Sequence, residues 1–341
     1  SSLHRCIETG KSMIGWDAKF PRIEQGSKVR GVGMAVTMQG SGIANIDTAS
    51  AEIRLNDDGF YTVLVGSTDM GTGSDTILLH MAADVLNADM DQFIINAADT
   101  DVSPFDPGSY ASSTTYVTGM AVKKAAEELR CKILEQAAKV LQAPADQLEL
   151  SGEQCVDPAS GKTVSVASIA AAAVVGPDHR QLSAYATFGS PVSPPPFVAG
   201  FAEVEVDKET GKVTLLDFVA VVDCGTVINP ALARVQTEGG IVQGIGMAMF
   251  EDVQYDKKGN LQSNSFMTYK IPGRSDVGIV RVAFEESYEP TGPFGAKSVG
   301  EVVINTPAPA IVAAIYNAVG VQITELPVTP EKVFKGMQQK S

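Results

Sequence analysis

The chain has 341 residues, of which 44% are hydrophobic, and its formal net charge at pH 7 is -14. A chain of this length exceeds one small hydrophobic core, so we expect two sub-domains in a folded protein. The acidic balance disfavours nucleic acid and anionic membranes as partners because both attract basic surfaces, and any anionic ligand must then be held locally by backbone amides.

The cysteines are few and widely spaced, and they do not form a C-x-x-C pattern. With only three histidines in the chain, neither a zinc site nor a disulfide framework is indicated, and reduced thiols in the cytoplasm are expected. No apolar run is expected to reach the roughly 18 residues of a membrane span, and the first residues lack the layout of a signal peptide. The four cysteines are Cys6, Cys131, Cys155 and Cys224.

The first part of the chain mixes strand and helix patterns. Residues 28–37, 51–55 and 60–65 have the composition of strands, and a turn signal separates the last two. Ser74 is placed to cap a helix, and residues 118–142 carry apolar side chains at helical spacing. This order predicts a β-hairpin region, with helices and strands mixed along this part of the chain.

A proline cluster at residues 193–196 precedes a new pair of predicted strands, 201–207 and 212–222. We therefore predict a first sub-domain at 1–196 and a second at 197–341. The fold class predicted is α+β, with two mixed α/β sub-domains.

The last clear helix is predicted to begin after Thr306, with Pro307 at its first position and Gly320 as its C-terminal stop.

A glycine-rich stretch, residues 66–76, follows a predicted strand and opens a predicted helix. In this context glycines let backbone amides approach an anion, and the helix dipole favours negative charge. The spacing of Gly66 and Gly71 is similar to that of a P-loop, but Thr72 stands where the lysine is required, which disfavours hydrolysis of a nucleoside triphosphate. The stretch is either a phosphate cradle or a tight strand-to-helix turn.

Residues 99–115 combine acidic, turn-forming and hydroxyl side chains ahead of a helix. A calcium loop is disfavoured because no glutamate closes the loop at the required spacing. The four consecutive hydroxyl residues either supply neutral donors to a phosphate or a polar ring, or cap the helix. They are Ser112, Ser113, Thr114 and Thr115.

Residues 236–246 contain four glycines in a segment with helical character. In a helix, Gln236, Gly240, Gln243 and Met247 would share one face. Each glycine costs a helix about 1 kcal/mol relative to alanine, so we expect another group to approach this backbone closely. Packing against a second helix would explain the glycines but not the two glutamines beside them.

A single carboxylate, Glu301, follows Gly300 and precedes an apolar run that leads into the last predicted helix. A carboxylate removed from water needs a partner or a proton. Glu301 is therefore either a capped structural acid or a general base.

Taken in this order, these stretches resemble the C-terminal half of the molybdopterin-binding subunit of the xanthine oxidase family of molybdenum hydroxylases. The resemblance extends over essentially the whole chain. Within the family, nicotinate dehydrogenase divides this subunit between two polypeptides, and its medium subunit is most similar in length and start point. The segments that carry the resemblance are 3–6, 66–73, 110–122, 236–246, 269–272 and 295–301.

The resemblance implies a molybdenum ion held by the dithiolene of molybdopterin, in the cytosine dinucleotide form, with no protein side chain as a metal ligand. It gives Glu301 the role of general base toward the water-derived oxygen that is inserted at an electron-poor carbon, and it places Gln243 near the molybdenum. A dry, apolar pocket would make this carboxylate a stronger base than it is in water. The terminal chalcogen on the metal is sulfur or selenium.

By the same resemblance, three stretches would bind the pterin or its nucleotide. Family members commonly carry glutamine where Thr72 stands, so one pterin contact is either lost or made by another chain. The implied cofactor-binding residues are Thr68, Met70, Gly71, Thr72, Gly73, Ser112, Ser113, Thr114, Thr115, Gln236, Gly240, Gln243 and Gly300.

The family's N-terminal half is not in this sequence, so the resemblance implies a large molybdopterin subunit that completes the active site. It also implies an iron–sulfur subunit and an FAD subunit, because four scattered cysteines do not suit two-iron clusters of the chain's own. The expected substrate is an N-heteroaromatic such as nicotinate. The alternatives are a purine, an aldehyde, carbon monoxide, an aryl-CoA thioester, a phosphate-binding enzyme using only residues 66–76, and a non-catalytic cofactor-binding or assembly module.

Overall fold

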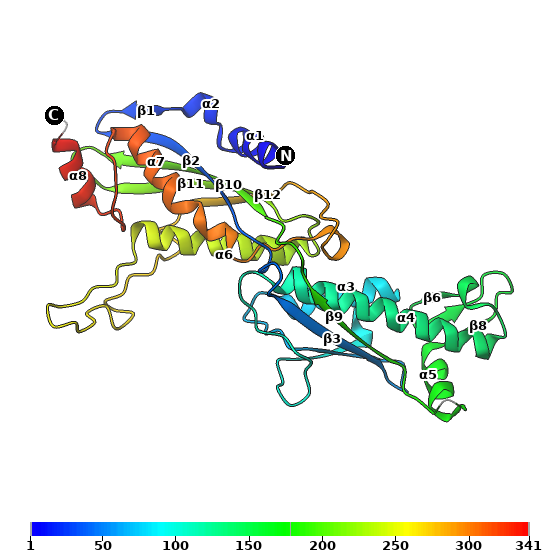
Figure 1. Ribbon diagram of the computed structural model, residues 1–341. Helices are drawn as coiled ribbons and strands as arrows, with labels where there is room; N and C mark the ends of the chain where they lie inside the picture. Colours follow the sequence, from blue (N-terminus) through cyan, green and yellow to red (C-terminus); the bar gives the residue numbers. More distant parts are fainter. Residues whose placement is uncertain (1, 178, 340–341) are drawn as a thin grey trace. The chain divides into compact units, whose positions relative to one another are not determined.

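The computed structural model describes residues 2–177 and 179–339, and the chain divides into two compact units (Figure 1). The first unit comprises residues 1–39, 195–287 and 299–341, and the second comprises residues 40–194 and 288–298. Both units combine a sheet with helices, so the predicted α+β class is confirmed.

The first unit is built on a five-stranded sheet in the order β1-β2-β10-β11-β12, with β12 parallel to β11 and the other neighbours antiparallel. Nearly every residue of β10 is buried, which requires cover on both faces of the sheet. The strands are β1 (Arg22–Gln25), β2 (Lys28–Met38), β10 (Phe197–Asp207), β11 (Val213–Asp223) and β12 (Ile279–Phe284).

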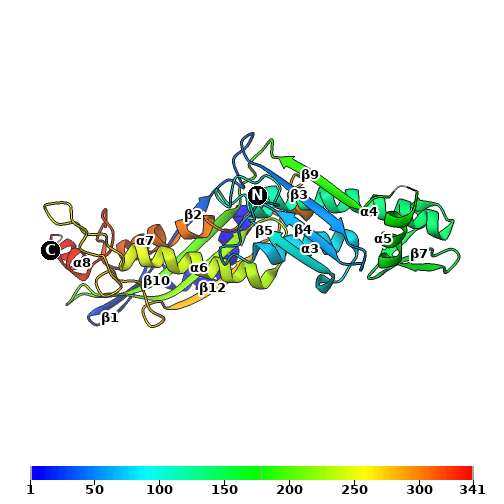
Figure 2. The same ribbon diagram turned by 90° about the horizontal axis from the view of Figure 1, so that it is seen from below.

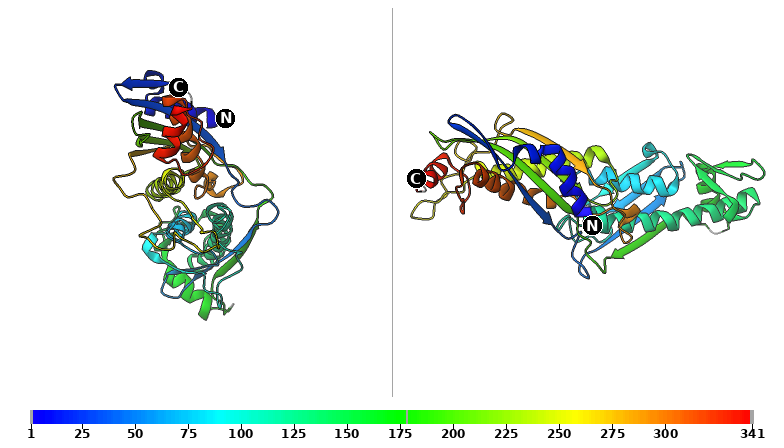
Figure 3. Two further views of the ribbon diagram at one scale, coloured as in Figure 1. Left: turned by 90° about the vertical axis from the view of Figure 1, so that its left-hand side faces the viewer. Right: turned by 90° about the horizontal axis from the view of Figure 1, so that it is seen from above.

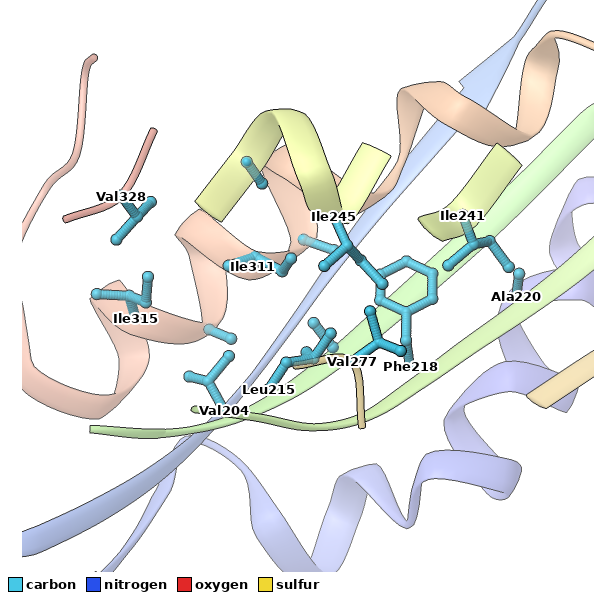
Figure 4. Close-up of a cluster of buried hydrophobic side chains, with 14 of the residues drawn as sticks. Val204, Leu215, Phe218, Ala220, Ile241, Ile245, Val277, Ile311, Ile315 and Val328 are labelled. Atoms are coloured by element: carbon cyan, nitrogen blue, oxygen red, sulfur yellow. The ribbon is translucent and has the colours of Figure 1, made fainter. Parts of the chain in front are cut away.

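Helices cover both faces of this sheet. On one face α6 and α7 run side by side (Figure 2), and their Ile241, Ile245, Ile311 and Ile315 pack with Phe218 of the sheet in one apolar cluster (Figure 4). On the other face α1 packs on β10 and β11. The helical elements of this unit are α1 (Ser2–Ile14), α2 (Trp16–Lys19), α6 (Pro230–Met249), η5 (Val302–Asn305), α7 (Pro307–Val319) and α8 (Pro330–Gln338).

The second unit has a four-stranded sheet in the order β5-β4-β3-β9 and a small three-stranded sheet, β6-β7-β8. The helices α3 and α4 lie side by side against the larger sheet (Figure 3). The strands are β3 (Thr48–Leu55), β4 (Tyr61–Val65), β5 (Phe93–Ala97), β6 (Glu149–Ser151), β7 (Gln154–Val156), β8 (Thr163–Ser165) and β9 (Ser183–Gly189). The helical elements are α3 (Ser74–Leu86), η1 (Met90–Gln92), η2 (Thr114–Thr118), α4 (Gly119–Leu141), η3 (Ala145–Gln147), α5 (Val166–Val175) and η4 (Pro293–Gly295).

The predicted division at residues 196 and 197 differs from the structure in two segments. Residues 1–39 belong to the first unit together with residues 195–287, because β2 within them pairs with β10 along its whole length. Residues 288–298 return to the second unit. The difference arises because strand pairing joins segments about 170 residues apart, and a local composition signal such as the proline cluster does not report such pairing.

One expectation about apolar runs is wrong. Residues 302–319 have the length and apolar composition of a membrane-spanning helix, and half of this stretch is buried. The structure divides the stretch into η5 and α7, and α7 packs against β2 and β10. The same composition thus serves as a core helix of the first unit.

Candidate functional site

The first glycine-rich stretch connects β4 to α3 in the second unit. Gly71 and Gly73 have φ angles of 93° and 77°, in the left-handed region that favours glycine. A Cβ atom on Gly71 would meet nothing within 4 Å. Backbone conformation, and not close packing, therefore explains this glycine.

The backbone amides of this loop are bound by a carboxylate of the same chain. The amides of Gly71 and Gly73 donate to Asp69 Oδ1 at 2.8 and 3.1 Å, and the amide of Asp75 donates to Asp69 Oδ2 at 3.3 Å. Thr72 Oγ1 also donates to Asp69 Oδ1, at 3.4 Å. The interpretation as a phosphate cradle therefore needs correction: Asp69 occupies the amides that such a cradle would offer, as expected for a tight strand-to-helix turn.

The two carboxyl groups of this loop are shifted in opposite directions. Burial alone would raise the pKa of Asp69, but the backbone donors of Asp75, Gly71, Gly73 and Thr72 together lower this pKa below its ordinary value. Burial, with the nearby charge of Asp69, raises the pKa of Asp75. The loop therefore favours the charged form of Asp69 and disfavours the charged form of Asp75.

Three buried polar atoms at this loop have no hydrogen-bond partner within the described residues: Ser67 Oγ, Ser74 Oγ and Asp75 Oδ1. Ser67 is fully buried, and Ser74 is almost so. The large majority of buried side-chain polar atoms in proteins are paired, so each exception requires an explanation, such as a ligand or water. The loop thus retains polar atoms that need partners although its amides are satisfied.

The predicted hydroxyl run lies in an unusual backbone segment. Ala111 and Ser112 have φ angles of 48° and 51°, which is uncommon for residues other than glycine. Residues Thr114–Thr118 then form a π-helical turn that leads into α4. Positive φ at non-glycine residues and π-helical turns both occur frequently at functional sites.

The structure brings the loop that precedes the hydroxyl run, at Asp106 and Ser109, together with the first glycine-rich stretch. Ser109 Oγ accepts a hydrogen bond from the amide of Thr68 at 3.0 Å and donates to the carbonyl of Thr68 at 2.9 Å. Thr118 Oγ1, at the end of the π-helical turn, donates to Asp106 Oδ2 at 2.8 Å. One side of Gly66 is closed by this second loop, because a Cβ there would lie 2.6 Å from Asp106 Cβ.

The Gln/Gly-rich stretch forms the middle of α6 in the first unit, as predicted. Gln243 and Met247 are exposed, and Gln236 is half-buried. Gly240 shares their side of the continuous helix, as predicted, but lies at the edge of that face that turns toward the core and is buried. The exposed part of the face also includes Gly239, where a Cβ would meet nothing within 4 Å.

Close packing within the unit explains two of these glycines. A Cβ on Gly240 would collide with Val303 Cγ2, and one on Gly244 would lie 2.6 Å from Pro307 Cγ and 2.7 Å from the carbonyl oxygen of Ile304. The expected close neighbour of this backbone is therefore the segment of η5 and α7. A contact between Gly240 and a cofactor remains a prediction.

Glu301 immediately precedes η5 and is exposed, as is Gly300. Gln39 Nε2 donates to Glu301 Oε2 at 2.7 Å. The dry, apolar pocket expected around Glu301 is thus not formed by the described part of this chain. Because η5 packs on α6, the structure does bring Glu301 and the Gln/Gly-rich helix onto neighbouring elements.

The candidate residues therefore form two groups, one in each unit. Sequence reasoning missed Gln39, Ser67, Ser74 and Gly239. Helical periodicity could have identified Gly239, which lies three residues after Gln236 and four before Gln243. No group of three or more His, Cys, Asp or Glu side chains suited to a metal ion occurs among the described residues.

Comparisons with known proteins give a consistent result. The family model of the molybdopterin cofactor-binding domain matches residues 9–278. The chain is 37% identical over 339 residues to the probable hypoxanthine oxidase XdhD of Escherichia coli K12, covering 99% of this chain and 35% of that protein. It is 34% identical to the putative xanthine dehydrogenase molybdenum-binding subunit XdhA of the same organism, covering 98% of this chain and 46% of that protein.

The structure is also similar to solved structures. Quinoline 2-oxidoreductase from Pseudomonas putida 86 superposes with a TM-score of 0.89 at 27% identity, covering 99% of this chain and 46% of that one. The chain thus spans less than half the length of the relatives it matches.

Proposed function

Because the chain belongs to the molybdopterin cofactor-binding domain family, within the xanthine oxidase family of molybdenum hydroxylases, we propose that it is the molybdenum-binding medium subunit of a multi-subunit hydroxylase. The observation that carries this proposal is the 37% identity to a probable hypoxanthine oxidase over 99% of the chain. The proposed reaction places an oxygen atom from water on an electron-poor carbon and releases two protons and two electrons.

The residues of the second unit fit a polar cofactor. Ser67 Oγ, Ser74 Oγ and Asp75 Oδ1 are buried and lack partners within the described residues. Hydroxyl groups can donate or accept, and a carboxylate accepts, so this set suits a ring system that carries both N–H groups and acceptor atoms. We propose that these atoms hold the pterin or its nucleotide together with Thr68–Gly73 and Ser112–Thr115, in the cytosine dinucleotide form of the cofactor.

When bound, the molybdenum cofactor supplies the two-electron acceptor for the reaction. This chain supplies the base: Glu301 accepts a proton at its carboxylate, and Gln39 Nε2, 2.7 Å from Glu301 Oε2, fixes the orientation of that carboxylate. Gln243, exposed on the same face of α6 as Gly239, is proposed to approach the metal. General-base catalysis of this kind contributes about 10²–10⁴-fold to a rate.

The exposure of Glu301 supports a requirement for a partner. A general base at a metal centre gains strength when water is excluded, and the described residues leave Glu301 exposed. We propose that a large molybdopterin subunit provides the missing cover. Electrons then leave through an iron–sulfur subunit and an FAD subunit, in a cytoplasmic complex.

The proposed substrate class is the N-heteroaromatics. A ring nitrogen withdraws electrons from the adjacent carbon and prepares it for attack by oxygen. Three matched proteins carry such compounds in their names: hypoxanthine, xanthine and quinoline. Nicotinate belongs to the same class and is one candidate among these.

The test is anaerobic reduction of the purified native complex by single substrates. We expect bleaching of the iron–sulfur and flavin absorbance with at least one of hypoxanthine, xanthine, quinoline or nicotinate, and the product should carry ¹⁸O from labelled water. Reduction by aldehydes alone would overturn the substrate class. A complex that contains molybdenum but is reduced by none of these compounds would support a non-catalytic cofactor-binding module.

A further inference from the structure

The connection between α6 and β12, residues 250–278, has an unusual surface. In Figure 1 it is the yellow segment that extends from the end of α6, and it contains only one isolated bridge, between Tyr255 and Leu261. Every residue from 252 to 276 is exposed except three that are half-buried. Connections longer than about 12–15 residues without regular structure are uncommon in compact domains and are usually functional segments or linkers.

Six large apolar side chains of this connection are exposed among its polar residues. Single exposed apolar residues are normal, but a concentration of them marks an interaction surface. Phe266 and Met267 are 87% and 84% exposed, so they bury almost nothing against this chain. The large apolar residues that are exposed here are Val253, Tyr255, Leu261, Phe266, Met267 and Ile271.

The main chain of this connection is held by its own hydrogen bonds. The amide of Gln262 donates to the carbonyl of Gln254 at 2.8 Å, and the amide of Gln254 donates to Ser263 Oγ at 3.1 Å. Near the end of α6, the phenolic hydroxyl of Tyr269 donates a hydrogen bond to the carboxylate of Glu251. An ordered surface loses less conformational entropy on binding than a flexible one.

Charge distinguishes this connection from the rest of the chain. Residues 251–277 contain four acidic and four basic side chains and are neutral overall, whereas the whole chain carries a net charge of -14. Interface cores are enriched in aromatic residues and methionine, and interface rims are polar. The connection has exposed aromatic and methionine side chains among charged residues whose charges balance, so it does not add to the negative charge of the chain.

We propose that residues 250–278 are the docking surface for the large subunit, the separate polypeptide that supplies the remainder of the molybdopterin-binding fold. This rests on the proposed function. The chain spans 35% and 46% of the two relatives in E. coli, so more than half of their length has no counterpart in this chain. A body of that size has ample surface to cover the six exposed apolar side chains of this segment.

The first test is lysine-directed crosslinking of the purified native complex, followed by mass spectrometry. Lys257, Lys258 and Lys270 lie within the docking surface, and Lys162, exposed in the second unit, is the control. We expect crosslinks from the three lysines of the docking surface to the large subunit, and none from Lys162. Crosslinks from the docking surface only to a second copy of this chain, or only to the iron–sulfur or FAD subunit, would overturn the proposal.

The second test is a matched pair of variants in the complete complex. Phe266→Asp combined with Met267→Asp should weaken binding of the large subunit about 30-fold or more, the effect of losing an interface hot spot. Val175→Asp replaces a side chain that is 77% exposed in the second unit and should leave binding unchanged. Thermal melting of each variant chain should match the wild type, because the replaced side chains are exposed.

The outcomes separate this proposal from the proposed function. A double variant that retains the large subunit with wild-type affinity overturns the docking surface, while molybdenum in that complex leaves the proposed function intact. A single polypeptide that carries both halves also overturns the proposal, because its partner is then not a separate chain. Absence of molybdenum from the wild-type complex counts against the proposed function itself.

Discussion

The two glycine-rich stretches of this chain look alike as sequences but contain glycine for different physical reasons. In residues 66–73, Gly71 and Gly73 adopt positive φ angles, and Gly71 has open space beside it. In α6, Gly240 and Gly244 are buried against η5 and α7, where no Cβ would fit. Glycine content alone therefore does not identify a ligand site, and the polar atoms left unsatisfied or exposed beside the glycines carry more information.

The largest expected effect separates chemistry from packing in the first unit. Glu301→Gln keeps the volume of the side chain and a hydrogen bond with Gln39 but removes the ability to accept a proton. We expect the molybdenum content of the complex to be unchanged and the rate of substrate reduction to fall by about 10²–10⁴-fold. Rapid-reaction spectroscopy on preparations matched for metal content measures this rate.

The control for this variant is Glu331→Gln, which alters an exposed pair with Lys335 on α8. It should change the rate less than twofold, because surface ion pairs contribute little. If substrate reduces the Glu301→Gln complex at the wild-type rate, Glu301 has a structural role. If it loses molybdenum, Glu301 is a cofactor-binding residue instead.

Two adjacent glycines of α6, one exposed and one buried, test whether packing and ligand contact can be separated on this helix. Gly240→Val forces a branched side chain into the space of Val303 and should lower the free energy of unfolding by about 1–3 kcal/mol. Gly239→Val extends into open space, so the free energy of unfolding should change by less than about 0.5 kcal/mol. Chemical denaturation of both variants measures these changes.

Molybdenum content completes this comparison. If the exposed face of α6 approaches the cofactor, Gly239→Val should lower the metal content of a complex whose stability is unchanged. Equal loss of stability in both variants would show that the two glycines do not differ in their surroundings.

The unsatisfied hydroxyl groups of the second unit allow a similar test. Ser67→Ala and Ser74→Ala should each weaken cofactor retention by about 0.5–1.5 kcal/mol, the value of one hydrogen bond, with little loss of protein stability. Tyr61→Phe removes another buried hydroxyl without a partner, at the start of β4, and should leave cofactor retention unchanged. Pterin release during dialysis, followed by fluorescence, compares the three. Faster release from Tyr61→Phe than from the serine variants would contradict this assignment.

The smallest effect is a pH dependence of stability. Because the pKa of Asp75 is raised, the folded state binds the proton of this carboxyl group more tightly than the unfolded state does. The free energy of unfolding should therefore rise as pH falls through that raised pKa. The lowered pKa of Asp69 gives stability that is present above the ordinary pKa of aspartate and is lost as pH falls through the lowered value. Melting temperatures measured across pH check both effects. The gain in stability at lower pH should be absent from Asp75→Asn, and the loss of stability at lower pH should be absent from Asp69→Asn. Identical profiles in all three proteins would contradict these shifts.

Local signals predicted the individual elements well. The expected helix at 118–142 is α4 at Gly119–Leu141, and Pro307 and Gly320 bound α7 as expected. Strand pairing was not predictable, since the pairing of β2 with β10 joins distant segments without a local signature.

The roles of the candidate site residues stay predictions. The sequence placed Gly240 on the same side of α6 as Gln236 and Gln243, but it could not show that this position is buried against η5, because helical spacing gives the direction of a residue and not what packs there. The hydrogen bond of Gln39 to Glu301 spans 262 positions and has no sequence signal. The exposure of Glu301 was not predictable either, because the surroundings of a side chain depend on contacts between segments far apart in the sequence.

The most direct test of the central claim is the stoichiometry of molybdenum and pterin in the native complex. Metal analysis by mass spectrometry, with chromatography of the nucleotide released from the cofactor, gives both quantities for each copy of this chain. We predict one molybdenum and one pterin, with cytidine monophosphate as the released nucleotide. A complex that is intact yet free of molybdenum and pterin, from cells able to make the cofactor, would contradict a cofactor-binding role for this chain.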